Sequence, residues 1–442
     1  MPILSKEETA SLLKKVLAYS KAEQCEANLD GSNRGNIRYA RNTVTTSGAL
    51  SDMTLVVESR YGKRVGQAVT NEFDDASLEK AVRRSEELAK LAPENPEAMP
   101  VLTPQTYLET KAAFESTAKL DAEYRAKAAA AGIEPCRAKG NLTAAGFLDH
   151  GENFSSMANT AGLAAYHRAT DVNFSVTVRT DDGTGSGYVT RDYNDAAKFD
   201  VAAASQIAID KALQSRTARA IEPGKYTVIL EPAALVSDEG LLNQMIFSMN
   251  ARQADEGRSF FSKTGGGTKI GEKIVDERIT IISDPTNADV PAPTWNGDGR
   301  PQERTTWIEK GVVKNLFYSR YWAQKMNQKA LPTPNNFIIA GGSGSTEDLI
   351  KDTKKGILVS RLWYIRGVDP QTLLYTGLTR DGTFYIENGK VKFPIKNLRF
   401  NESPIIMLNN IEALGKPERM LGNLVPPMKI RDFTFTSLSD AV

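Results

Sequence analysis

Apolar positions along the first 92 residues predict a compact unit in which two helices surround short strands. Residues 5–8 (SKEE) have the pattern of a capping box, which predicts a helix from there to about Tyr19. A second helix, capped by Asp74 or Asp75, is predicted to extend to about Leu91, because its apolar residues recur at the helical period. Glycines separate the short strands predicted between them, at residues 23–29, 36–39, 53–59 and 64–70.

The next part of the chain combines further helices with longer strands. Residues 93–105 contain four prolines, which is typical of a connector. Helices are predicted at residues 116–131 and 195–213, and strands at 135–146, 153–159 and 162–180. The glycine-rich run 181–187 (DDGTGSG) is predicted to be a hairpin tip, because it lacks the lysine of a phosphate-binding loop.

From residue 225 onward most predicted elements are strands. Their positions are residues 225–230, 278–283, 306–310, 312–318, 337–340, 356–365, 382–387, 390–393 and 395–401. The dipeptide Asn388-Gly389 between two of them is a strong hairpin signal. Many short strands after a single helix are typical of a barrel or a sandwich. The expected fold class is α+β, with helices and small sheets in the N-terminal half and a strand-rich, β-barrel-like or sandwich C-terminal domain.

These elements predict a division of the chain into three domains. They are an N-terminal α+β domain (1–92), a middle α/β segment with long strands (106–220) and the C-terminal β-rich domain (221–442), with 93–105 as the connector.

One segment, residues 231–261, places acidic side chains on an apolar helical face. Pro232 suits the first turn of a helix. The apolar face would consist of Leu235, Leu242, Met245, Ile246 and Met249. Asp238 falls within this face and Glu239 at its edge. Either the helix dipole or an arginine stabilises these carboxylates, or they form an acid–base or metal site, which would favour Mg²⁺ or Ca²⁺ over Zn²⁺.

Composition narrows the classes of function. The 442 residues carry 55 basic and 54 acidic side chains, and the net charge of +1 gives no sign of a nucleic-acid partner. The N-terminus lacks the pattern of a signal peptide, and no apolar run is long enough to cross a membrane. Two cysteines in unrelated contexts indicate a reducing compartment. We therefore expect a cytoplasmic protein without a membrane contact.

Several blocks of sequence resemble the TldD/PmbA family, long labelled modulators of DNA gyrase. They are VILEPAALVSDEGLL (228–242), GRSFFSKTGGGTKIGEKIVDERITIISDPT (257–286), GVVKNLFYSRYWAQKM (311–326), PTPNNFIIAGG (332–342) and TGLTRDGTFYIENGKVKFPIKNLRFNES (376–403). The first half matches more loosely, so the resemblance covers nearly the whole chain.

The resemblance implies a metallopeptidase-related protein. The family's catalytic branch, TldD, is a zinc peptidase with a His-Glu-three-residues-His motif on the helix of the first block and a cysteine near the C-terminus. A catalytic zinc site requires three protein donors. Here the corresponding window, residues 240–247 (GLLNQMIF), has no histidine, cysteine or carboxylate, and residues 408–442 have no cysteine. The resemblance therefore implies the zinc-less PmbA/TldE-like branch, with no metal of its own and zinc only in a TldD-like partner.

A charged and aromatic cluster in the C-terminal domain is the candidate peptide-binding site. Its members are Arg361, Trp363, Arg366, Asp369, Arg380 and Asp381. Arginine binds carboxylates through paired hydrogen bonds, and aromatic rings supply apolar contact. The alternative is a structural ion-pair network between strands. The histidines His150 and His167 have no zinc-like spacing and are predicted to be surface or hairpin residues.

Together these observations predict a zinc-less subunit that acts in proteolysis or peptide maturation. It would form a homodimer, or a heterodimer with a TldD-like subunit that supplies the zinc-activated water, and would help to enclose the peptide substrate. Two alternatives stay open: a peptide-binding scaffold with no proteolytic role, and a hydrolase that uses Asp238 and Glu239.

Overall fold

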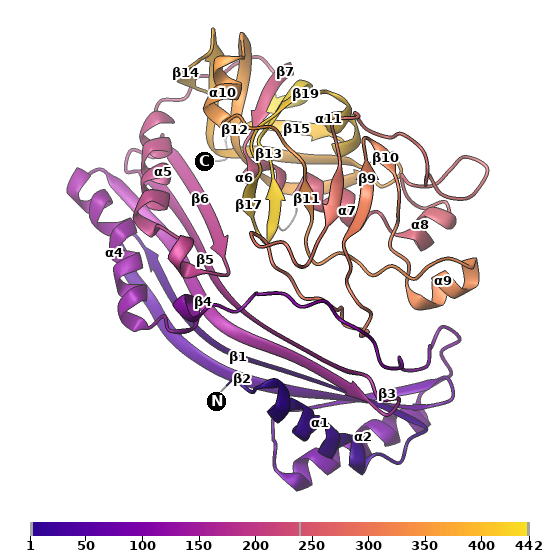
Figure 1. Cartoon of the computed structure of the whole chain (residues 1–442). Helices are drawn as coiled ribbons and strands as arrows, with labels where there is room; N and C mark the ends of the chain where they lie inside the picture. Colours follow the sequence, from indigo (N-terminus) through magenta and orange to yellow (C-terminus); the bar gives the residue numbers. More distant parts are fainter. Residues whose placement is uncertain (1–2, 238–239, 440–442) are drawn as a thin grey trace.

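A curved sheet and a strand-rich C-terminal region are the two main parts of the molecule (Figure 1). This computed structural model describes residues 3–237 and 240–439. Helices lie on the outer face of the curved sheet, and the C-terminal region lies on its inner side (Figure 1). None of the helices in the described ranges has the length and hydropathy that a membrane span requires.

The N-terminal half forms one antiparallel sheet, which over the described residues has six strands in the order β3-β2-β1-β4-β5-β6. The strands are β1 (Gln24–Ala40), β2 (Thr43–Tyr61), β3 (Arg64–Thr70), β4 (Leu142–Asn159), β5 (Ala164–Thr180) and β6 (Ser186–Tyr193). β1 pairs with β4 from Glu26 to Tyr39. Backbone hydrogen bonds thus join the predicted segments 1–92 and 106–220, and their division into separate domains stays a prediction.

Helices cover the outer face of this sheet and bury its apolar side chains. They are α1 (Lys6–Tyr19), α2 (Asp75–Leu91), α4 (Ala122–Lys139) and α5 (Val201–Gln214), with the short α3 (Glu115–Ala118) and the 3-10 turn η1 (Ala196–Lys198). The predicted capping box of Ser5 and Glu8 opens α1, and Asp74 caps α2. One core cluster lies beneath α1 and α2 around Leu29, and another beneath α4 and α5 around Phe174.

The strands are longer than the sequence predicts, because two glycines lie inside a strand instead of ending it. At Gly31, in β1, a Cβ atom would lie 2.3 Å from the ring of Phe154. At Gly35, in the same strand, it would lie 2.1 Å from the guanidinium group of Arg125. Both glycines therefore make room for a side chain above the strand. Gly62 does separate two strands, with φ of 57° in the turn between β2 and β3.

The middle segment corrects one prediction and confirms another. Pro135, predicted to open a strand, lies inside α4, which continues to Lys139 and ends at Gly140 with φ of 73°. The strands predicted at 135–146 and 153–159 are in fact the single strand β4. The hairpin tip predicted at residues 181–187 is confirmed, since this run joins β5 to β6.

The C-terminal region contains a closed five-stranded barrel, so the predicted α+β class with a barrel-like C-terminal part is confirmed. The barrel strands are β7 (Gly224–Leu230), β12 (Lys355–Asp369), β13 (Leu374–Glu387), β15 (Leu398–Glu402) and β19 (Met428–Leu438). Pairing of β12 with β13 closes the ring. The predicted turn at Asn388-Gly389, with φ of 52° and 72°, joins β13 to β14 (Lys390–Pro394).

A second sheet packs with the barrel around one shared core that includes Ile281, Trp307 and Phe400. In the described chain its strand order is β10-β9-β8-β11-β18-β17. Its strands are β8 (Ile281–Ser283), β9 (Thr305–Glu309), β10 (Val312–Val313), β11 (Ile338–Ile339), β17 (Glu418–Met420) and β18 (Asn423–Val425). Further elements of this region are α9 (Arg320–Met326), α10 (Thr346–Lys351), α11 (Pro404–Asn409) and β16 (Ile411–Leu414), which pairs with β19.

The single helix predicted to begin at Pro232 is wrong. Over the residues that the structure describes, this segment forms three short helices, α6 (Pro232–Leu235), α7 (Leu241–Phe247) and α8 (Ala251–Asp255). Gly240 precedes α7 and lies so close to α6 that a Cβ atom would be 2.7 Å from the carbonyl oxygen of Leu235. The apolar residues predicted to share a face are nevertheless all buried, namely Leu235, Leu242, Met245, Ile246 and Met249. Asp238 and Glu239 lie outside the described residues.

Candidate functional site

The six residues predicted to bind peptide all lie on the hairpin formed by β12 and β13. They are Arg361, Trp363, Arg366, Asp369, Arg380 and Asp381. The pairing register places Arg361 opposite Arg380, whereas Arg366 and Asp369 lie nearer the turn that joins the two strands. The hairpin therefore divides the cluster into an inner part against the N-terminal sheet and an outer part near the turn.

Asp381 is the buried centre of the inner part, with 2% of its surface exposed. Its carboxylate accepts a hydrogen bond from Ser186 Oγ at 2.6 Å and one from Arg361 Nη1 at 2.9 Å, and Arg380 Nε lies 3.8 Å away. Its backbone has φ of 55°, in the left-handed region that aspartate and asparagine tolerate better than most residues. Because Ser186 begins β6, this carboxylate joins the barrel to the N-terminal sheet.

Aromatic rings hold the arginines of the cluster in place. The Arg361 guanidinium lies 3.9 Å from the ring centre of Tyr188, and that of Arg380 lies 4.1 Å from the ring centre of Trp363. Burial lowers the pKa of Arg380. The inner part therefore has the geometry of an ion-pair network between strands. Trp363 and Tyr364 are nevertheless 37% and 50% exposed, so their rings can still contact a ligand.

Asp369 shapes the hairpin turn through hydrogen bonds within its own loop. Its carboxylate accepts hydrogen bonds from Thr372 Oγ1 at 2.6 Å and from the backbone N–H of Gln371 at 3.1 Å. The Thr372 hydroxyl lowers the pKa of Asp369. This pattern is that of an Asx turn, which gives Asp369 a local structural role.

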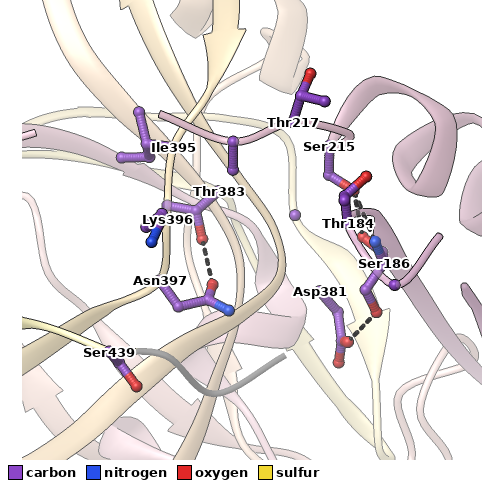
Figure 2. A pocket seen from close by; sticks show the side chains of 13 residues that line it. Thr184, Ser186, Ser215, Thr217, Asp381, Thr383, Ile395, Lys396, Asn397 and Ser439 are labelled. Carbon is purple, nitrogen blue, oxygen red and sulfur yellow. Dashed lines mark hydrogen bonds between the residues drawn. The ribbon is translucent and has the colours of Figure 1, made fainter. Parts of the chain in front are cut away.

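A cavity of about 300 Å³ opens beside Asp381, where the β5–β6 tip meets the barrel (Figure 2). Figure 2 shows Thr184, Ser186 and Ser215 on one side and Thr383, Lys396 and Asn397 on the other. Ser215 Oγ donates to the carbonyl oxygen of Ser186 at 2.8 Å, and Thr383 Oγ1 donates to Asn397 Oδ1 at 3.3 Å. The lining offers hydroxyl, amide and ammonium groups together with the Asp381 carboxylate, and no histidine of the described chain lines it.

The window that the resemblance matches to the family's zinc motif folds as the helix α7. Its buried face consists of Leu241, Leu242, Met245 and Ile246, and its more accessible side chains are Asn243, Gln244 and Phe247. Across residues 3–237 and 240–439, no three His, Cys, Asp or Glu side chains lie close enough to hold a metal ion together. The donor set of the described residues therefore does not fit a catalytic zinc.

Both histidines lie on the hairpin formed by β4 and β5, as one of the two predicted placements has it, but both are buried, so the alternative that they are surface residues is wrong. His150 in β4 is 5% exposed, and its Nε2 lies 3.1 Å from Nη1 of Arg125. His167 in β5 is 8% exposed, and burial lowers its pKa to about 4. Packing from α4 covers the first and the C-terminal region covers the second, which polar neighbours in sequence do not reveal.

Sequence reasoning also missed a buried carboxylate that holds the two parts of the molecule together. Asp192, at the end of β6, accepts hydrogen bonds from Arg419 Nε at 2.9 Å and from the backbone N–H groups of Leu421 and Gly422 at 2.6 and 2.9 Å. The partners are at least 227 residues apart in sequence. No local pattern could have identified this contact.

Two family profiles match most of the chain. The profile of the PmbA/TldA metallopeptidase central domain matches residues 108–216, and that of the PmbA/TldA metallopeptidase C-terminal domain matches residues 223–437. The chain belongs to the PmbA/TldD family. The resemblance in the sequence is thereby confirmed.

Curated relatives are similar at low identity. An uncharacterised protein of Methanocaldococcus jannaschii is 26% identical over 80% of this chain and 83% of its own length. The metalloprotease PmbA of Escherichia coli O157:H7 is 23% identical over 49% of each chain. A metalloprotease TldD homolog of Buchnera aphidicola is 24% identical over 70% of this chain and 66% of its own.

Solved structures share the fold over almost the whole chain. TldE from Thermococcus kodakarensis has a TM-score of 0.84 at 17% identity, covering 97% of this chain and 99% of that one. A Thermotoga maritima protein described as a modulator of DNA gyrase has a TM-score of 0.85 at 14% identity, covering 97% and 100%. At these identities the likeness concerns the fold alone.

Proposed function

We propose that this chain is a zinc-less subunit of a PmbA/TldD-type peptidase in the cytoplasm. It acts in proteolysis or peptide maturation, paired with itself or with a TldD-like zinc peptidase. The observation that carries the proposal is α7, where the family's zinc motif would lie. Four of its seven residues are buried and apolar, and none is a His, Cys or carboxylate. A partner with the motif would supply the zinc.

The positions of the histidines and cysteines, the side chains that most often bind zinc, support this proposal. His150 and His167 lie on β4 and β5, whereas Cys25 and Cys136 are both fully buried, in β1 and α4. Burial raises the pKa of both thiols, to about 11 for Cys136, which disfavours the thiolate form that binds zinc.

The polar inner face of the sheet supports a role in enclosing peptide. Arg34 in β1 makes two hydrogen bonds to Asp171 in β5, at 2.9 and 2.7 Å, and also pairs with Asp149 in β4. Asn153 and Asn173 donate to the same Asp171. This fixed row of charges and amides lies on the face opposite the helices and can orient a peptide that runs between the sheet and the C-terminal region.

The test combines metal analysis with reconstitution. The chain is purified untagged and without chelator, and its zinc content and peptidase activity on an unstructured peptide are measured alone and with a zinc-bearing family member of the same organism. We expect zinc well below one per chain, no activity alone, and a stable complex in which activity needs both chains. Near-stoichiometric zinc with activity of the isolated chain would overturn the proposal.

The scaffold alternative is favoured by the ion pair of Arg361 and Asp381, which accounts for the inner cluster without a ligand. Substituting Arg366 and Arg380 by alanine separates the two functions. Loss of proteolysis in an intact complex supports peptide binding at the hairpin, and unchanged proteolysis supports the scaffold. A hydrolase that uses Asp238 and Glu239 stays a prediction, and unchanged activity of Asp238→Asn would remove it.

A further inference from the structure

A second cavity, of about 430 Å³, lies between the inner face of the N-terminal sheet and the C-terminal region. Its floor is formed by Asn28, Asp30, Ser155 and His167, on neighbouring strands β1, β4 and β5. The register sets Asp30 opposite Ser155 and Ser155 opposite His167, so these side chains share one face of the sheet. Its far wall is the loop of residues 293–297 together with Asn335.

Three residues around this cavity each carry a buried polar atom without a hydrogen-bond partner. They are Nε2 of His167, Nε1 of Trp295 and Oδ1 of Asn296. His167 is 8% exposed and Trp295 is 7% exposed. A buried polar group without a partner is unfavourable, and most such groups in folded proteins are satisfied. Three of them around a single cavity thus indicate a place that a ligand completes.

The wall of this cavity is rigid. The Trp295 ring packs in a buried cluster with Met157, Leu163 and Ala165, and its ring centre lies 6.5 Å from that of Tyr107. The backbone N–H of Asn296 donates to the carbonyl oxygen of Arg300 at 3.1 Å. Packing therefore holds the Trp295 ring, and a backbone hydrogen bond holds the main chain at Asn296, which lowers the entropy cost of binding.

The three unpaired atoms define the chemistry of the ligand. The indole N–H of Trp295 can only donate, the amide oxygen of Asn296 can only accept, and His167 with its low pKa is a neutral ring that does one or the other. Asp30 is the single charged residue among the described residues that line the cavity, and no lysine or arginine does so. A single carboxylate with no cation disfavours an anionic ligand, and a ligand that fits carries both a carbonyl acceptor and an N–H donor, as a neutral peptide backbone does.

We infer that this cavity binds a neutral peptide segment, whose backbone carbonyl accepts from Trp295 and whose backbone N–H donates to Asn296. This inference deepens the proposed function, because it names a place where the chain holds peptide. It can nevertheless be tested on the isolated chain, without a partner and without zinc.

The test uses N-acetyl-trialanine methylamide as a neutral probe and N-acetyl-triglutamate methylamide as an anionic probe of the same length. The chain has four tryptophans, so the indole N–H signals in a ¹H–¹⁵N spectrum are few, and the Trp295→Phe variant assigns the signal of Trp295. The neutral probe should shift that signal saturably, and the anionic probe should bind more weakly. Absence of a saturable shift, or equal binding of the anionic probe, would overturn the inference.

Calorimetry on variants then measures the contribution of each group. Trp295→Phe keeps an apolar ring and removes the donor, and Asn296→Ala removes the acceptor on a more accessible residue. Each should weaken the neutral probe roughly three- to tenfold, as expected for one hydrogen bond. Trp322→Phe is the matched control, because its Nε1 donates to Asp255 at 2.7 Å outside the cavity, and it should bind normally. Unchanged affinity in both cavity variants would refute the assignment.

The outcomes separate this inference from the proposed function. If the chain binds the neutral probe through Trp295 but forms no active complex with a zinc-bearing relative, the inference about the cavity is supported and the proposed function is refuted. If the complex is active but its peptide binding is insensitive to Trp295→Phe and Asn296→Ala, the proposed function is supported and the inference about the cavity is refuted.

Discussion

Replacing Asp381 by asparagine tests whether this carboxylate holds the barrel against the N-terminal sheet. Asparagine has the same shape and also tolerates the left-handed backbone at this position, where φ is 55°. It can still accept from Ser186. It cannot pair with Arg361, whose Nη1 lies 2.9 Å from the carboxylate and whose side chain is 24% exposed. The substitution therefore removes a charge pair and leaves the backbone unchanged.

The expected loss follows from the burial of the pair. Leaving the partner of a fully buried ion pair uncompensated costs about 3–5 kcal/mol, and a hydrogen bond to a charged group contributes about 1.5–3 kcal/mol. Since Arg361 is partly exposed and the contact with Ser186 survives, we expect Asp381→Asn to lower the free energy of unfolding by about 2–3 kcal/mol. Ser186→Ala, which leaves the ion pair intact, should cost less, about 1–2 kcal/mol.

The assay is urea unfolding followed by tryptophan fluorescence and by far-ultraviolet circular dichroism, so that the two probes reveal any intermediate. Arg361→Met keeps the apolar stem of the side chain and removes its charge. The double variant Asp381→Asn/Arg361→Met should then lose less stability than the sum of the single variants. A loss below about 0.5 kcal/mol for Asp381→Asn, or strict additivity in the cycle, would refute the structural role.

Further predictions concern a histidine, a turn and a second interface carboxylate. Burial lowers the pKa of His167 from 6.5 to about 4, so the stability that its neutral ring contributes is complete above pH 6.5 and is lost as the pH falls to about 4. In unfolding measured as a function of pH, the wild type should therefore lose up to about 3 kcal/mol over that range relative to His167→Gln. Gly389→Ala should lower the free energy of unfolding in urea by about 2–4 kcal/mol, because φ is 72° and a Cβ atom would lie 2.6 Å from the Lys351 carbonyl oxygen. Gly422→Ala, where φ is also 72° but no atom lies near the Cβ position, should lower it by only about 1–2 kcal/mol. Equal losses would contradict the clash. The Asp192 carboxylate accepts hydrogen bonds from two backbone N–H groups in the β17–β18 turn, so Asp192→Asn should speed hydrogen exchange there. Unchanged exchange would contradict that role.

The features that the sequence predicts correctly depend on local chemistry. The caps at Ser5 and Asp74 satisfy N–H groups within three residues of themselves. The turn at Asn388-Gly389 needs two consecutive residues that tolerate positive φ, and this dipeptide provides them. The barrel-like character of the C-terminal region follows from strand frequency alone. Each of these signals lies within a few residues of the element that it determines.

The features that the sequence does not reveal depend on distant partners. β19, which the strand predictions omit, pairs with β7 and β15 and so completes the barrel, although these strands are far apart along the chain. The sequence predicts that Gly31 ends a strand, whereas in the structure it lies inside β1 and makes room for the ring of Phe154. The composition of the candidate cluster predicts a binding site, but the role of Asp381 depends on Ser186, which lies 195 residues before it. Such contacts are set by topology.

The alternation in β1 shows how a site can be hidden in an ordinary pattern. Residues of one parity, such as Leu29 and Ile37, are buried beneath the helices, and those of the other parity, such as Asp30 and Arg34, are polar. From the sequence alone, the polar residues of this strand would be expected to face solvent. In the structure it is the face that meets the C-terminal region, where Arg34 pairs with Asp171 and Asp30 lines the cavity of Trp295. Polar residues of a half-buried strand therefore mark either solvent or a polar interface, and only the element that packs opposite decides between them.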